Sequence, residues 1–145
     1  MKKKGDLYTV KGRGLEGTVE RIHLFDGSFS TAYQLVKVEI ANTDPFAGEE
    51  ISIKVKTEEG TAGSAWNWGL NTQIGWAVMN APIGSRYGYN AFVDPDNLIV
   101  EDVFIDFGSG TAGAEINYML TFQKYDITDW KGALAMVRNK SQGAD

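Results

Sequence analysis

The sequence predicts an all-β fold, an antiparallel sandwich of about eight strands within a chain of 145 residues. Three observations carry this prediction. Hydrophobic and polar residues alternate over several short segments, turn-forming residues separate those segments, and the chain holds 17 glycines, seven phenylalanines, six tyrosines and four tryptophans. Alternation places one face of each strand against a core and the other toward solvent or a neighbour.

Residues 1–16 are basic and interrupted by glycines, which predicts an N-terminal arm leading into the sandwich. The basic residues are Lys2, Lys3, Lys4, Lys11 and Arg13. With one acidic residue among them, residues 1–13 carry a formal charge of +4, so residues 14–145 carry −9 of the chain total of −5. Such an arm contacts nucleic acid or an acidic neighbour, or it is a solvated terminus; both interpretations stay open.

The strands of the sandwich are expected within residues 17–127. The clearest alternation covers 36–40, 51–55, 102–107 and 116–123, and weaker candidates are 17–25, 31–35, 72–79 and 86–93. Turn chemistry falls between them at Asp26-Gly27, 42–48, 94–97 and 108–113. Seven or eight short strands at this spacing indicate a sandwich or barrel.

Residues 128–145 break the strand pattern and predict a C-terminal helix over 128–140 with a short tail. Trp130, Ala133, Leu134 and Val137 fall at i, i+3, i+4 and i+7, and Arg138 lies near the end where the helix dipole favours cations. The apolar stripe is narrow and includes a tryptophan, a residue enriched at interfaces. The helix therefore covers its own sheet, as part of the same domain, or docks on another subunit.

No catalytic motif is visible in the sequence. The chain has no cysteine, and the one histidine, His23, lies within a candidate strand without a local nucleophile. No apolar run approaches the ~20 residues that cross a bilayer. We therefore expect neither an enzyme, nor a cofactor, nor a membrane protein.

The tetrad Asp94-Pro95-Asp96-Asn97 offers the sequence's weak candidate for a metal site. Asp94 and Asp96 bring two carboxylates close together, and such hard oxygen ligands suit calcium. The tetrad lacks the glycine and distal glutamate of an EF-hand loop, so a turn stabilised by aspartate side chains is the stronger interpretation.

Aromatic residues gather between positions 66 and 89 and supply the main alternative function. Trp66 and Trp68 share a face if their segment is extended, and Trp76 follows in a candidate strand. Exposed tryptophans with polar neighbours would suit a carbohydrate-binding module. The same residues also suit a core or a subunit contact, which is the commoner use.

Two stretches resemble a known family. Residues 94–105, DPDNLIVEDVFI, and 116–126, INYMLTFQKYD, resemble the late strands of small single jelly-roll capsid proteins from environmental, mainly marine, viruses of the single-stranded DNA type. Residues 127–143, ITDWKGALAMVRNKSQG, are similar to the C-terminal helix and tail of that group. The resemblance covers about the last third of the chain.

The resemblance implies a jelly-roll coat subunit that self-assembles into a closed capsid, made in the host cytoplasm and carried in the virion. Copies of the chain would be the partners, with genome nucleic acid or acidic neighbours reached by residues 1–13. The implied interface residues are Lys2, Lys3, Lys4, Lys11, Arg13, Trp130, Leu134, Val137 and Arg138. The chain lacks the long arginine-rich arm of many such coats, which weighs against genome packaging by residues 1–13.

Overall fold

The computed structural model describes residues 2–24, 31–44, 49–80 and 88–126, with the backbone alone for 2–6. Over these residues the fold is all-β, and they contain no helix. The helix predicted over 128–140 lies outside the described residues.

Eight strands are assigned within these ranges. They are β1 (Lys2–Leu15), β2 (Val19–Ile22), β3 (Thr31–Asn42), β4 (Ile51–Lys56), β5 (Gln73–Asn80), β6 (Gly88–Val93), β7 (Val103–Ser109) and β8 (Glu115–Asp126). Every candidate strand of the sequence analysis contributes to one of them. The candidates at 31–35 and 36–40 join into the single strand β3, with an irregularity between Leu35 and Lys37.

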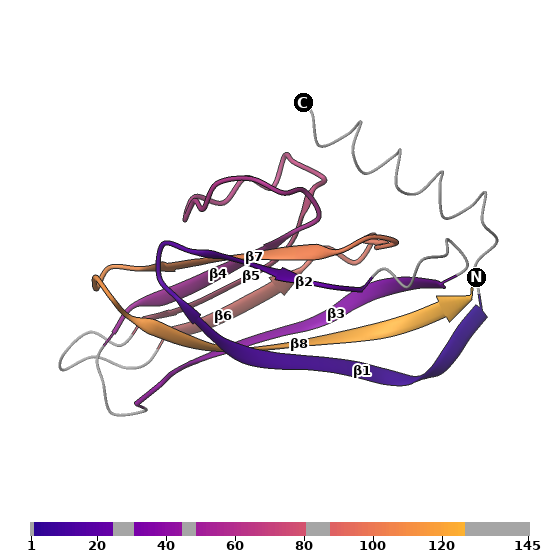
Figure 1. Ribbon diagram of the computed structural model, residues 1–145, viewed down its shortest axis with the longest axis horizontal. Coiled ribbons are helices and arrows are strands. Elements are labelled where there is room, and N and C mark those ends of the chain that lie inside the picture. The colour runs from indigo at the N-terminus through magenta and orange to yellow at the C-terminus, as the bar shows by residue number, and fades with distance from the viewer. Residues whose placement is uncertain (1, 25–30, 45–48, 81–87, 127–145) are drawn as a thin grey trace.

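The strands form two antiparallel sheets stacked as a sandwich. The three-stranded sheet has the order β1-β8-β3, and the five-stranded sheet has the order β2-β7-β4-β5-β6. Figure 1 shows the three-stranded sheet along the lower side, with β7, β4, β5 and β2 above it. The predicted sandwich is thereby confirmed, and the distant ends of the chain pair with each other through β1 and β8.

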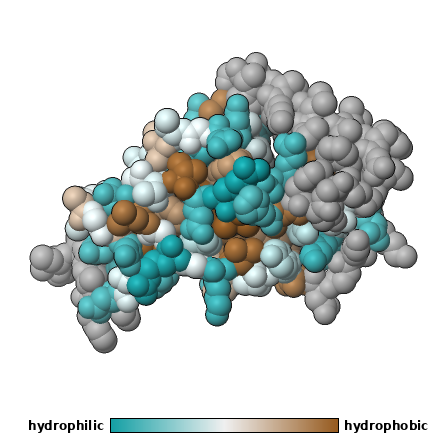
Figure 2. Space-filling model, in the orientation of Figure 1, coloured by the Kyte–Doolittle hydropathy of each residue, from teal (hydrophilic) through white to brown (hydrophobic). Residues whose placement is uncertain are grey.

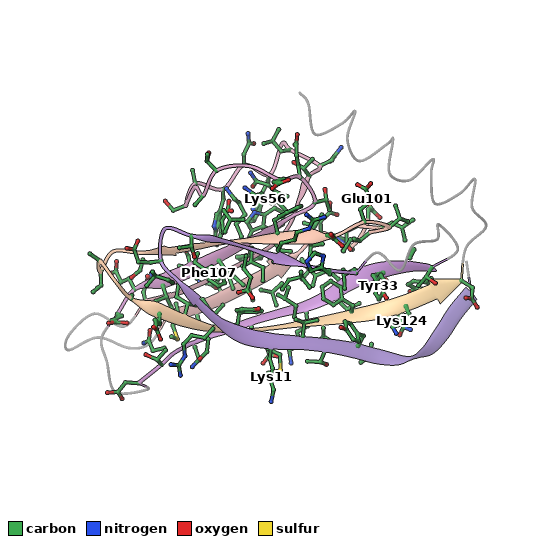
Figure 3. The ribbon with its side chains drawn as sticks, viewed as in Figure 1. Lys11, Tyr33, Lys56, Glu101, Phe107 and Lys124 are labelled. Carbon is green, nitrogen blue, oxygen red and sulfur yellow. The ribbon has the colours of Figure 1, made fainter. Side chains whose placement is uncertain are left out.

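Alternation along the strands places the core between the sheets. In β8, Ile116, Leu120 and Phe122 are fully buried, whereas the intervening Met119 is exposed. Tyr33 and Phe107 point into the space between the layers in Figure 3. Hydrophobic burial between the two inner faces is therefore the main stabilising contribution.

The segment expected to be an N-terminal arm is instead a strand. β1 pairs with β8 from Lys2 opposite Asp126 to Leu15 opposite Glu115. Gly12 and Gly14 pack closely against the core, because a Cβ added at Gly14 would lie 2.2 Å from the ring of Phe107 and one added at Gly12 would lie 2.8 Å from the Tyr118 hydroxyl oxygen. Pairing with β8 and packing on the core override the weak strand pattern of this segment.

Candidate functional site

The three predicted tryptophans lie together on the outer face of the five-stranded sheet. Trp76 of β5 is the register neighbour of Phe92 in β6, and the loop 57–72 brings Trp66 and Trp68 over this pair. Ring centroids are 5.5 Å apart for Trp68 and Trp76, 5.4 Å for Trp68 and Phe92, and 6.4 Å for Trp66 and Phe92. We call these four residues the aromatic cluster.

The aromatic cluster is not the platform of three surface tryptophans that the sequence suggested. Trp76 is only 5% exposed, so it supports the cluster from beneath, whereas Trp68 is 62% exposed. The rings are inclined by 47° to 76° instead of lying in one plane. Phe92, 42% exposed, was missed because its place beside Trp76 depends on strand pairing that no local pattern reveals.

Two lysines of β4 hold the loop 57–72 over the sheet. Lys54 Nζ donates to the carbonyl of Ala65 at 2.9 Å, and Lys56 Nζ donates to that of Thr61 at 3.4 Å. Figure 1 shows the loop, in magenta, above the β4 and β5 layer. The exposed Trp68 is therefore carried by a loop that is tied to the sheet at several points.

Asp106 of β7 balances part of this buried positive charge. Its Oδ2 lies 3.3 Å from Lys54 Nζ and 3.0 Å from Lys56 Nζ, and its side chain is 1% exposed. Neither carboxylate oxygen makes an aligned hydrogen bond within the described residues, so the contact is ionic. The three groups carry a formal net charge of +1 and are almost fully shielded from solvent.

The outer face of the three-stranded sheet is the second candidate surface. Lys11 of β1, Met119 of β8 and Glu39 of β3 lie side by side in the strand register. They border a hollow of about 570 Å³, whose lining also includes the small residue Ala41. In Figure 3, Lys11 points away from the sandwich. We call this feature the β8 hollow.

The predicted interface residues divide between described and undescribed parts of the chain. Lys11 borders the β8 hollow, and Arg13 lies beside it in an exposed ion pair with Glu115 at 3.1 Å. The side chains of Lys2, Lys3 and Lys4, and all of Trp130, Leu134, Val137 and Arg138, lie outside what the structure describes. The sequence did not single out Met119, whose exposure follows from its place between inward-facing neighbours.

The tetrad 94–97 forms a turn stabilised by its own side chains. Asp94 Oδ1 accepts a hydrogen bond from the amide of Asp96 at 3.0 Å, and the amide of Asn97 donates to the Asp94 carbonyl. Over the described part of the chain, no group of three or more histidine or carboxylate residues is placed to hold a metal ion. The geometry is that of the Asx-type turn expected as the stronger interpretation.

Side chains replace a missing neighbour strand along the edge of β3. Asn97 accepts from the Leu35 amide at 2.8 Å and donates to the Leu35 carbonyl at 2.9 Å, as a paired backbone would. Farther along, the Tyr89 hydroxyl accepts from the Ile40 amide and donates to the Val38 carbonyl. These contacts occupy backbone groups that would otherwise invite another chain to pair.

His23 belongs to a polar group at the end of β2. Asp102 accepts from Arg21 Nε at 2.7 Å and from the Leu24 amide at 2.9 Å, and His23 Nδ1 lies 3.3 Å from Asp102 Oδ2. The carboxylate thus has several fixed partners and holds the chain as it leaves β2. Figure 3 shows the neighbouring Glu101 on the side of the molecule opposite Lys11.

Comparison with known proteins adds no assignment, because no family model, curated protein or solved structure matches the chain. Among the described residues, no helix is long and apolar enough to cross a membrane.

Proposed function

We propose that this chain is a structural coat protein that self-assembles into a closed viral shell, as its resemblance to small jelly-roll capsid proteins implies. The observation that carries the proposal is the distribution of exposed apolar side chains. Trp68 and Phe92 lie on the outer face of one sheet, whereas Leu7 and Met119 lie on the other sheet. Separate apolar surfaces suit contacts with more than one neighbour.

Strand order supports the finer proposal that the sandwich is a jelly roll. β1 pairs with β8, β2 pairs with β7, β4 pairs with β5, and the Tyr89 side chain links β6 to β3. The neighbours are therefore nested along the chain: the outermost strands β1 and β8 lie together, then β2 and β7, then β3 and β6, and finally the middle strands β4 and β5. A rolled-up antiparallel ribbon produces this nesting, and it is the wrapping expected of a jelly roll.

The proposed partners are further copies of the chain and, through residues 1–13, genome nucleic acid or an acidic neighbour. Lys11 supports this because it projects from the outer face of the sheet. Figure 2 shows hydrophobic residues interspersed with hydrophilic ones over the viewed face, a mixture typical of contacts between separately folded subunits. The proposed location is the virion, after synthesis in the host cytoplasm, and the role needs neither catalysis nor a cofactor.

The first experiment is light scattering after size exclusion at low and moderate salt. We expect a uniform particle many times heavier than the 15.9 kDa chain. Trp68→Ala should weaken assembly without unfolding the subunit, because Trp68 is largely exposed. A monomer of 15.9 kDa at every concentration and salt would overturn the proposal.

A carbohydrate-binding module remains the second candidate, favoured by one observation. Trp68 is 62% exposed and lies next to the polar Asn67, whose side-chain Oδ1 accepts from the Gly69 amide in a tight turn. One rigidly held tryptophan can stack on a sugar ring. Binding of a glycan by the monomer, measured on a glycan array and lost in Trp68→Ala, would favour this function over assembly.

A further inference from the structure

The β8 hollow combines an apolar floor with rims of opposite charge. Met119 lies at the centre and is 36% exposed. Lys11 lies on one side and Glu39 on the other, in one register row across three adjacent strands. Two strand spacings separate the charged rims, about 9–10 Å at the backbone. A complementary ligand would carry an anion, an apolar group and a cation in that order.

The rim charges are available to a partner to different degrees. The described residues give Lys11 no hydrogen bond or ion pair. Glu39 faces Lys37 at 3.3 Å, in an exposed ion pair that water screens and that contributes little to stability. The short side chain of Ala41 lines the hollow two residues along β3 from Glu39, whereas a side chain at Gly12 would point to the inner face, toward Tyr118. A thioether such as that of Met119 makes favourable contacts with aromatic rings.

We propose that the β8 hollow binds the segment Asp129-Trp130-Lys131 of a second copy of this chain. The inference rests on the proposed self-assembly and names one of its contacts. Trp130 packs on Met119, Asp129 faces Lys11 and Lys131 faces Glu39. In the helix that the sequence predicts over 128–140, successive residues are about 100° apart. The two charged residues therefore flank the tryptophan on opposite sides, as the rims require.

Chain geometry assigns this segment to a second copy. Asp126 is seven residues beyond Met119 along β8, which is about 23 Å. Trp130 is four residues beyond Asp126, and the helix expected from residue 128 would carry it back by only about 6 Å. In that helix the Trp130 of the same chain would stay about 17 Å short of Met119, and the hollow extends still farther, to Asn117.

Crosslinking tests the contact directly, because the chain contains no cysteine. Ala41→Cys borders the hollow, and Ala133→Cys lies one predicted helical turn from Trp130, so both variants keep all six proposed contact residues. When the two single variants are mixed and oxidised, we expect a disulfide-linked heterodimer on a non-reducing gel. The matched control pairs Ala133→Cys with Asn90→Cys, an exposed position on β6, and should stay unlinked.

Charge exchange tests the orientation. Glu39→Lys and Lys131→Glu should each raise the concentration needed for half-assembly by about tenfold, as the loss of one interfacial ion pair can do. The double variant should assemble like the original protein. Particles that form normally, with no specific crosslink and no rescue, would overturn this contact while leaving self-assembly standing. A monomer at every concentration would overturn self-assembly, and this contact with it.

Discussion

The two sheets have similar alternating strands, but their outer faces differ in what covers them. On the five-stranded sheet, the outward Lys54, Asp106 and Trp76 are buried beneath the loop 57–72. On the three-stranded sheet, the outward Lys11 and Met119 remain exposed. Alternation thus indicates which residues leave the core, but it does not say whether solvent or another part of the chain receives them.

The outer face of the five-stranded sheet is therefore covered by the chain itself, whereas the outer face of the three-stranded sheet leaves room for a partner. The covered face contains the charged side chains of Lys54, Lys56 and Asp106. Removing one of the opposite charges would destabilise the folded state strongly, because an unpaired charge would remain in a site shielded from water. The open face contains ion pairs at the surface, such as Arg13 with Glu115, where each charge is also solvated. Substitutions of the same chemical kind should therefore have unequal effects on the two faces.

Asp106→Ala should cause the largest loss of stability. The substitution leaves Lys54 and Lys56 buried without their counter-charge, which typically costs about 3–5 kcal/mol. On the open face, Glu115→Ala removes an exposed partner of Arg13 and should cost at most about 1 kcal/mol. Denaturant titration measures both free energies of unfolding. Equal losses of stability in the two variants would mean that the loop 57–72 does not shield Asp106, Lys54 and Lys56 from solvent.

The sequence predicts seven of the eight strands because each brings its own alternation or turn signals. β1 was missed for a physical reason: its lysines and glycines have little strand preference, and its partner β8 lies about a hundred residues away. The loop over the aromatic cluster was missed similarly, since the bonds to Lys54 and Gln73 that fix it form only after β4 and β5 pair. Local patterns predict the strands, whereas tertiary contacts decide which outer faces of the sheets are covered by a loop.

Gly14→Ala should distinguish a packed strand from a free arm. The added Cβ would meet the Phe107 ring at 2.2 Å, and relief requires movement of a buried ring, so we expect a loss of about 1–3 kcal/mol. Gly63→Ala in the loop 57–72 is the control, because its nearest neighbour is the flexible end of Lys54 at 3.9 Å. Thermal and denaturant unfolding of both variants measures the difference. An unchanged stability for Gly14→Ala would place residues 2–15 outside the fold.

Asn97→Ala should cost about 1–3 kcal/mol by leaving the buried Leu35 backbone groups without partners. The loss would expose the edge of β3, so we also expect more aggregation on heating. Asp96→Ala in the same turn is the control, because its exposed side chain lies beside these bonds without making them, and it should change stability by less than about 0.5 kcal/mol. Similar losses in both would show that the turn, and not the amide of Asn97, protects the edge.

Tyr118→Phe should have the smallest effect at neutral pH and a larger one in alkali. Burial and the hydrogen bond to Glu20, which crosses from β8 to β2, raise the pKa of the Tyr118 hydroxyl well above its usual range. Loss of that bond costs about 0.5–1.5 kcal/mol at pH 7. Above about pH 10, an unfolded tyrosine ionises while the folded Tyr118 stays protonated, so the unfolded state binds fewer protons and the original protein loses stability as pH rises.

The phenylalanine variant lacks this titration and should lose less stability between pH 9 and about pH 11, so the difference between the two proteins should shrink or reverse. Denaturant titrations of both proteins at a series of pH values measure it, with the other tyrosines common to both. Parallel pH profiles would show that Tyr118 is not shielded between the sheets. The Glu20 contact would then contribute nothing to holding the two layers together. If the free energies of unfolding of the two proteins converge as the pH rises, the contact between Tyr118 and Glu20 lies in the interior of the sandwich. Both sheets must then be intact to keep the Tyr118 hydroxyl protonated.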